Sequence, residues 1–150
     1  MEGTIQHRVV AWWASGRTGI AKSSSAPNAI HFTAPPEFGG VEGRWTPEDL
    51  FLGAVASCYT TTFRALAEHS KFEYTDLEVT AEGTVQKVDP SYAFSEIVIG
   101  ANLIISCELE QERALRLLQK AGELCLVARA ISVPQRLEPR VQIHRAVPVG

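Results

Sequence analysis

The sequence predicts an α+β fold in a single domain spanning residues 1–150. Segments rich in β-branched and aromatic residues occupy the start of the chain, and a long helical segment follows them. Two further strand-like segments then precede a second helical region and a last short strand. Because strands and helices come in runs instead of strict alternation, the pattern favours α+β over α/β. With 45% apolar residues, a chain of this length can bury one substantial core.

A meander of three short strands is expected near the N-terminus. Residues 5–14 read IQHRVVAWWA, a β-branched and aromatic run. Turn residues at 15–19 separate this run from a second one at 20–24, and a third lies at 29–33. Short runs of this kind between turn signals indicate neighbouring strands.

A long helix is predicted from residue 46 to about residue 69. The string PPEFGGVEGRW at 35–45 contains two Pro and three Gly and therefore indicates a loop. Thr46 can cap the helix, Pro47 suits its first position, and the two acids that follow complement the helix dipole. The next segment, LFLGAVASC, is apolar on all sides, which is typical of a fully enclosed central helix.

The second half of the chain predicts a hairpin of two long strands at 74–87 and 95–105, joined through residues 88–92. Alternating apolar and polar residues in the first of them indicate one buried face and one wet face. The last segment, RVQIH at 140–144, is expected to close the sheet.

Between these strands the sequence predicts an amphipathic helix over residues 108–123, because leucines recur among charged residues. Gly122 is expected to interrupt this helix. The segment CLVARAIS at 125–132 then begins a further turn or short helix, which places Cys125 near a helix start.

Composition excludes several classes of partner. The net charge is -3 without any Lys/Arg cluster, so neither nucleic acid nor an anionic membrane surface is expected to bind. The N-terminal MEGTIQHRVVAWW lacks the features of a signal peptide, and we expect no apolar run near the ~18 residues of a membrane span. We therefore expect a cytoplasmic protein. Single scattered histidines and the absence of CxxC lead us to expect no metal site.

Two of the three cysteines, Cys58 and Cys125, lie in apolar helical contexts. In a reducing compartment such thiols serve either packing or redox chemistry. Packing is the alternative at both positions, because free cysteine is among the most buried residue types. Cysteines on two separate core helices can instead exchange a dithiol for a disulfide if they meet. Cys107, at the end of a strand, is expected to be structural.

The segment TPEDLFLGAVASCYTTTF resembles the signature of the OsmC/Ohr family of organic hydroperoxide reductases. Upstream, ASGRTGIAKSS resembles the family's glycine-flanked arginine turn, and APPEFGG resembles the loop before its helix. Downstream, LLQKAGELCLVARAI resembles its second cysteine segment, although Leu126 stands where the family commonly has proline. The resemblance covers nearly the whole chain in order. It implies strongly curved antiparallel sheets around two central helices, in an intertwined homodimer.

The resemblance also implies roles for individual residues. Cys58 would be the peroxidatic thiol and Cys125 the resolving thiol. Arg17 would be the guanidinium beside the thiolate, and Glu48 the carboxylate that holds it. Without the resemblance, Arg17 is a solvated turn residue and Glu48 a partner of the helix dipole. The side chains expected to contact the substrate are Phe38, Trp45 and Phe51.

The chemistry implied is reduction of organic hydroperoxides to alcohols through a sulfenic acid on Cys58 and an intramolecular disulfide. A thiol in an apolar pocket needs a fixed positive charge nearby to ionise, and an arginine supplies one that does not titrate. No bound cofactor is expected, and the resemblance implies an external dithiol reductant of the lipoyl type. The alternative is a non-catalytic OsmC-like dimer that binds a small apolar ligand in the same cleft.

Helix geometry adds an argument for the dimer. Glu48 and Cys58 are ten residues apart, which on a regular helix means about 15 Å along the axis and about 80° around it. One arginine can hardly touch both residues of the same helix. A two-fold dimer with antiparallel central helices would bring Glu48 of one subunit beside Cys58 of the other.

Overall fold

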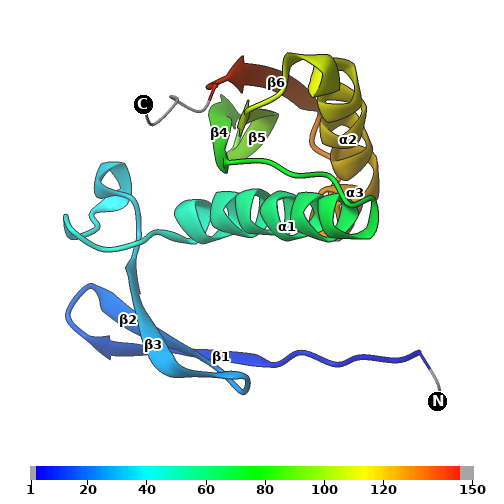
Figure 1. The fold of residues 1–150 in the computed structure, drawn as a ribbon. Coiled ribbons are helices and arrows are strands. Elements are labelled where there is room, and N and C mark those ends of the chain that lie inside the picture. The colour runs from blue at the N-terminus through cyan, green and yellow to red at the C-terminus, as the bar shows by residue number, and fades with distance from the viewer. Residues whose placement is uncertain (1–2, 146–150) are drawn as a thin grey trace. The chain divides into compact units, whose positions relative to one another are not determined.

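The computed structural model describes residues 3–145, whose contacts divide the chain into two compact units, Met1–Phe51 and Leu52–Gly150. The first unit contains β1 to β3 and the loop after them, and the second contains the remaining strands and the helices α2 and α3. Helix α1, Pro47–His69, begins in the first unit and continues into the second (Figure 1). The class is α+β as predicted, and the single domain over residues 1–150 stays a prediction.

The first unit is a three-stranded antiparallel meander in the order β1-β2-β3. Its strands are longer or shorter than predicted by a few residues: Val9–Ser15, Thr18–Ser23 and Ala26–Thr33. Gly16 has a φ of 55° in the two-residue turn between β1 and β2, a conformation that glycine adopts without steric cost. This turn places Arg17 at the tip of the β1–β2 hairpin.

The loop after β3 contains a short 3₁₀ helix, η1, at Pro36–Phe38, and then leads into α1. The N–H of Asp49 donates to the Thr46 hydroxyl at 3.1 Å, and the N–H of Thr46 donates to the Asp49 carboxylate at 2.9 Å. This reciprocal pair satisfies two N–H groups that a helix start otherwise leaves free. The predicted start at Thr46 and end at His69 are therefore confirmed.

Helix α1 buries one stripe of side chains, not its whole circumference. The buried residues recur every fourth position, which places them on one face of the helix. They are Val55, Tyr59, Phe63 and Ala67. The prediction that the first half of the helix is enclosed on all sides is thus wrong for the chain by itself, because other faces carry half-buried or exposed residues.

By length and composition, α1 also passes as a membrane span, with a mean hydropathy of 1.2 over its best window of 18 residues. The sequence-based expectation that no apolar run reaches this length is therefore wrong. Core helices of water-soluble proteins pass the same test, and the buried stripe of α1 packs inside the second unit.

The second unit contains a three-stranded mixed sheet in the order β4-β5-β6. β4, Asp76–Val88, and β5, Ser91–Ile105, form the predicted antiparallel hairpin. β6, Gln135–Ile143, pairs in parallel with β5, so the expectation of wholly antiparallel sheets is wrong at this pair. The helical connection between β5 and β6 carries the chain back to the same end of the sheet, which a parallel pair requires. β6 also begins earlier than predicted, because Pro139 is tolerated in an edge strand.

Three helices connect β5 to β6: η2 at Glu108–Glu110, α2 at Gln111–Leu124 and α3 at Leu126–Arg129. Gly122 does not interrupt α2, which corrects the sequence-based expectation. A Cβ at Gly122 would lie 3.6 Å from Leu137 and 3.9 Å from Tyr59, so this turn of the helix packs closely against neighbouring elements. Packing of this kind outweighs the cost of about 1 kcal/mol that glycine brings to a helix interior.

Helices α1 and α2 cover the same face of the β4-β5-β6 sheet (Figure 1). Leu52 of α1 lies against Gly83 of β4, and Gly122 of α2 lies against Leu137 of β6. Alternate residues of β5 are buried beneath the helices, as the period of a strand requires. These residues are Ile97, Ile99, Ala101, Leu103 and Ile105.

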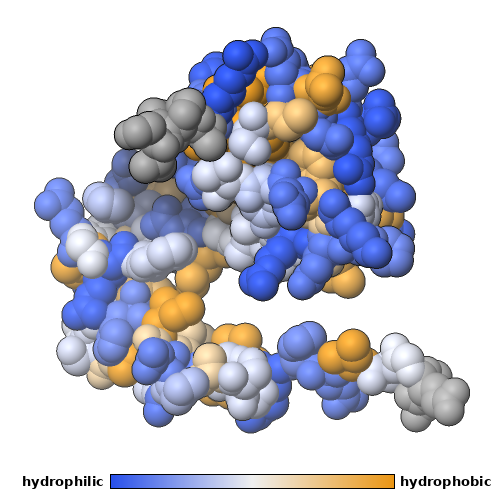
Figure 2. Space-filling view, viewed as in Figure 1, coloured by the Kyte–Doolittle hydropathy of each residue, from blue (hydrophilic) through white to orange (hydrophobic). Residues whose placement is uncertain are grey.

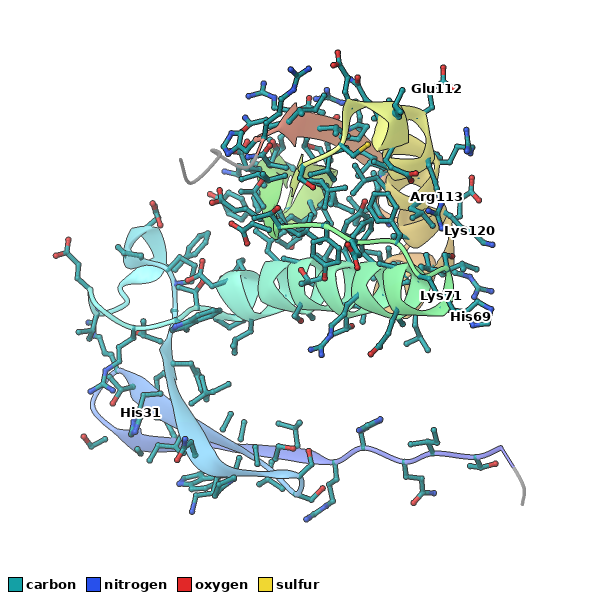
Figure 3. The ribbon with its side chains drawn as sticks, in the orientation of Figure 1. His31, His69, Lys71, Glu112, Arg113 and Lys120 are labelled. Atoms are coloured by element: carbon teal, nitrogen blue, oxygen red, sulfur yellow. The ribbon has the colours of Figure 1, made fainter. Side chains whose placement is uncertain are left out.

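Arg113 joins the start of α2 to the end of α1. Its guanidinium donates to the carbonyl of Ser70, pairs with Glu110 at 3.1 Å and lies over the ring of Phe72 at 5.3 Å. Figure 3 shows Arg113 on α2 near Lys71, at the C-terminal end of α1. A cation at this position also complements the helix dipole of α1.

The first unit carries many exposed apolar side chains, and Figure 2 shows apolar surface over its strands. Patches of this kind on a folded chain mark surfaces that another molecule covers. The large exposed side chains of β1 and β3 are Val9, Val10, Trp12, Trp13 and Ile30.

Candidate active site

The structure brings Cys58 and Cys125 together. Cys58 lies half-buried on α1. Cys125 is fully buried and is the residue in extended conformation between α2 and α3. The two thiols are close enough for each to shift the pKa of the other, and both are free, without a disulfide between them. A dithiol–disulfide exchange needs two neighbouring thiols of this kind. Their catalytic roles stay predictions.

The surroundings of Cys58 favour its thiolate. Burial by itself raises the pKa of the Cys58 thiol, but hydrogen bonding with the Val127 N–H, the Cys125 thiol, the Thr62 hydroxyl and the Leu126 N–H outweighs it. The net result is a pKa below the ordinary value of 9.0. Donors aimed at a sulfur atom stabilise its charged form, which is the reactive nucleophile.

Cys125 shows the opposite behaviour. Burial raises the pKa of the Cys125 thiol, and the Cys58 sulfur raises it further by hydrogen bonding and by charge. Two adjacent thiols resist double ionisation, because the second thiolate would face the first. The first proton to leave the pair is therefore that of Cys58, and Cys125 keeps its proton.

Tyr59 is fully buried and lies near Cys125, whose sulfur acts on its phenol. Its hydroxyl donates to the carbonyl of Leu118 on α2 at 2.7 Å, which ties α1 to α2 next to Cys125. Burial raises the pKa of the Tyr59 phenol well above its usual range, and the Cys125 sulfur adds to the rise. Tyr59 therefore stays protonated and serves as a donor.

The N–H groups of Leu126 and Val127 are the part of this site that sequence reasoning missed. They belong to the start of α3, where backbone N–H groups have no partner within the helix. The sequence placed Cys125 near a helix start, and this was the available signal. It did not indicate that the free N–H groups point at a cysteine of a different helix.

Arg17 and Glu48 form no ion pair among residues 3–145. Arg17 is exposed at the tip of the β1–β2 hairpin, and its Nη1 donates to the carbonyl of Gly39 at 2.6 Å. Glu48, in the first turn of α1, has its Oε2 shielded from solvent without a hydrogen-bond partner. A shielded carboxylate oxygen is costly unless a donor or a cation meets it. The predicted pairing stays a prediction.

The three apolar residues predicted to contact substrate all lie in the first unit. Phe38 ends η1 and Trp45 precedes α1, and each has 54% of its surface exposed. Phe51 is half-buried on α1. Trp45 also lines an open cavity of about 390 Å³ together with other residues of this unit. They are Ala29, Ile30, His31, Gly43, Arg44 and Leu50.

No group of three His, Cys, Asp or Glu side chains gathers as a metal-binding set in the part of the chain that the structure describes. The expectation of no metal site stays a prediction. Cys107 is exposed and precedes η2, and it is not among the groups that act on Cys58 or Cys125.

Comparison with known proteins places this chain in a family. A profile of OsmC-like proteins matches residues 40–139. The uncharacterized protein YmaD of Bacillus subtilis is 27% identical over 136 residues, covering 87% of this chain and 91% of that protein. Organic hydroperoxide resistance protein-like 1 of Staphylococcus saprophyticus is 28% identical over 126 residues, covering 84% and 88%.

The fold agrees with this match. A solved structure of an OsmC-like protein of unknown function from Vibrio cholerae superposes with a TM-score of 0.78 at 18% identity. The superposition covers 91% of this chain and 99% of that one. The family profile spans the loop before α1, the Cys58 helix, the β4–β5 hairpin and the Cys125 segment, and on this match the chain belongs to the OsmC-like protein family.

Proposed function

We propose that this protein is a cysteine-based peroxidase that reduces organic hydroperoxides to alcohols. The observation that carries the proposal is that the Cys58 and Cys125 thiols act on each other and that their pKa values shift in opposite directions. One thiol is poised to ionise and attack, while its neighbour keeps a proton. Membership of a family that includes a protein named for organic hydroperoxide resistance supports the same chemistry.

The proposed cycle begins with attack of the Cys58 thiolate on the terminal oxygen of the hydroperoxide. The O–O bond breaks, the alkoxide takes a proton and leaves as an alcohol, and Cys58 becomes a sulfenic acid. The Cys125 thiol then attacks the Cys58 sulfur, which releases water and forms the disulfide. An external dithiol, which we propose to be of the lipoyl type, reduces this disulfide and is itself oxidised. No bound cofactor takes part in these steps.

We further propose that Arg17 assists the Cys58 thiolate and that Glu48 holds the guanidinium. The shielded and unpartnered Oε2 of Glu48 supports a cation at this carboxylate. The guanidinium of Arg17 uses one of its donors on Gly39, which leaves others for a carboxylate and a peroxide oxygen.

The proposed assembly is a two-fold homodimer with two sites. Glu48 and Cys58 lie on one continuous helix, about 15 Å apart along its axis, so a single arginine does not bridge them within one chain. The exposed apolar side chains of the first unit supply a surface for the second subunit. Phe38, Trp45 and Phe51 would supply the apolar contacts for a bulky organic hydroperoxide.

Peroxide-dependent thiol mapping tests the proposal. One equivalent of cumene hydroperoxide is added to the reduced protein, free thiols are alkylated, and the three cysteines are located by mass spectrometry. We expect loss of Cys58 and Cys125 as free thiols, a disulfide between them, and an unchanged Cys107. A Cys107→Ser variant is the matched control and should behave like the wild type. If all three thiols survive treatment, the non-catalytic ligand-binding dimer becomes the better explanation.

A further inference from the structure

Thr33 and Thr46 are the buried polar residues in the described part of the first unit, and Thr33 is the more buried, with only 1% of its surface exposed. Its hydroxyl donates to the carbonyl of Arg17 at 2.9 Å and accepts the N–H of Val41 at 3.0 Å. Its own N–H donates to the carbonyl of Trp45 at 2.9 Å. One buried side chain thus joins the tip of the β1–β2 hairpin to the loop after η1.

The same loop holds the side chain of Arg17. Gly39, in a left-handed conformation with a φ of 85°, presents its carbonyl to the Arg17 guanidinium at 2.6 Å. A Cβ built on Gly40 would lie 1.6 Å from the carbonyl oxygen of Ala34, so this position accepts glycine only. The backbone of Arg17 is therefore held through Thr33, and its guanidinium is held through Gly39.

We infer that Thr33 is a positioning residue that holds Arg17 in place for the reaction at Cys58. The inference rests on the proposed function, because it assumes that Arg17 serves the thiolate. An exposed arginine at the tip of a two-residue turn otherwise samples many rotamers. Without the Thr33 hydroxyl, the Arg17 carbonyl and the Val41 N–H would each bond to water instead. Anchoring of both the backbone and the guanidinium of Arg17 keeps the guanidinium in one place before the peroxide arrives. The entropy cost of ordering this side chain is then not added to the barrier of the reaction.

Three substitutions test the inference through activity. Thr33→Val keeps the shape of the side chain and removes the hydroxyl, whereas Thr33→Ser keeps the hydroxyl. We expect Thr33→Val to slow reduction of cumene hydroperoxide roughly ten- to hundredfold, the effect of a misplaced catalytic group. Thr33→Ser should retain most of the wild-type rate. In an Arg17→Ala background, Thr33→Val should cost nothing further, because both act through the same guanidinium.

A purely structural role for Thr33 predicts a different pattern. Loss of fold stability would add to the effect of Arg17→Ala and would appear as a lower melting temperature without a change in the pH profile of Cys58. Equal rates for Thr33→Val and Thr33→Ser, or full additivity with Arg17→Ala, would overturn the inference.

A readout without peroxide separates this inference from the proposed function. Hydrogen exchange at the Val41 N–H, measured by NMR, reports directly on its bond to Thr33. We expect several-fold faster exchange in Thr33→Val than in Thr33→Ser. Thr33→Ala, which also removes the hydroxyl and leaves a smaller side chain, should have the same effect should Thr33→Val not fold. Unchanged exchange in these variants refutes the link that Thr33 makes between the Arg17 turn and the loop after η1. If the wild type reduces no peroxide but Val41 exchanges faster in Thr33→Val than in Thr33→Ser, the proposed function and the positioning role of Thr33 are both refuted. The hydrogen bonds of Thr33 would then still stand.

Discussion

Replacing Leu126 with proline tests the contribution of a single N–H group to the Cys58 thiolate. Leu126 is the first residue of α3, a position that proline tolerates well, and its side chain is 73% exposed. Cys125 before it has a φ of -61° and a ψ of 112°, which suits a residue that precedes proline. The substitution therefore removes the N–H that bonds Cys58 and leaves the start of the helix in place.

The expected effect follows from the strength of this bond. A hydrogen bond to a charged group contributes about 1.5–3 kcal/mol. The lower end applies here, because Cys58 is only half-buried and other donors, among them the Val127 N–H and the Cys125 thiol, remain. About 1.4 kcal/mol corresponds to a factor of ten, and the Leu126 N–H is the smallest of the contributions that lower this pKa, so the thiolate fraction of Cys58 below its pKa should fall by at most about tenfold.

The assay is alkylation of Cys58 by iodoacetamide across a range of pH, with the modified residue located by mass spectrometry. In Leu126→Pro we expect the titration to move to higher pH and the rate near neutral pH to fall by up to about tenfold. Leu126→Ala is the matched control, because it keeps the N–H and removes an exposed side chain. If the proline and alanine variants titrate alike, the N–H groups of α3 do not activate this thiol.

Three further predictions rest on the same site. Alkylation of Cys58 should be half-maximal below pH 9.0 and that of Cys125 above it, because the pKa of the first is lowered and that of the second raised; the reverse order would contradict the assigned asymmetry. Tyr59→Phe should lower the free energy of unfolding by about 1 kcal/mol in urea titrations, because the hydrogen bond to Leu118 is lost, and an unchanged midpoint would show that this bond contributes nothing. Arg17→Ala should raise the pKa of Cys58 and slow peroxide reduction roughly a hundredfold in stopped-flow measurements, whereas unchanged kinetics would remove Arg17 from the site.

The sequence predicted those elements whose ends are set by capping residues or whose faces follow from a regular spacing of apolar residues. Thr46, Pro47 and Asp49 specify the start of α1 through caps and dipole, and the structure shows the reciprocal hydrogen bonds that this pattern implies. The alternation in β4 predicted one more buried face and one wet face, because the period of a strand is two. Gly122 was expected to break its helix, and the last strand was expected to begin only after Pro139; both expectations missed tertiary context. Glycine destabilises a helix interior and proline removes a hydrogen bond from a strand. Close packing offsets the first cost at Gly122, and the edge position of β6 makes Pro139 acceptable.

The sequence by itself determined the order of the elements, the α1 helix and the two cysteine segments that resemble the OsmC/Ohr pattern. Only the tertiary structure decided that Cys58 meets Cys125 at the first N–H groups of α3, and that Thr33 joins the Arg17 turn to the loop after η1. The physical reason is that caps and periods act between residues close in the chain. A thiol pair, by contrast, depends on how a core of side chains from α1, α2 and the β4-β5-β6 sheet closes, and no local pattern encodes that closure.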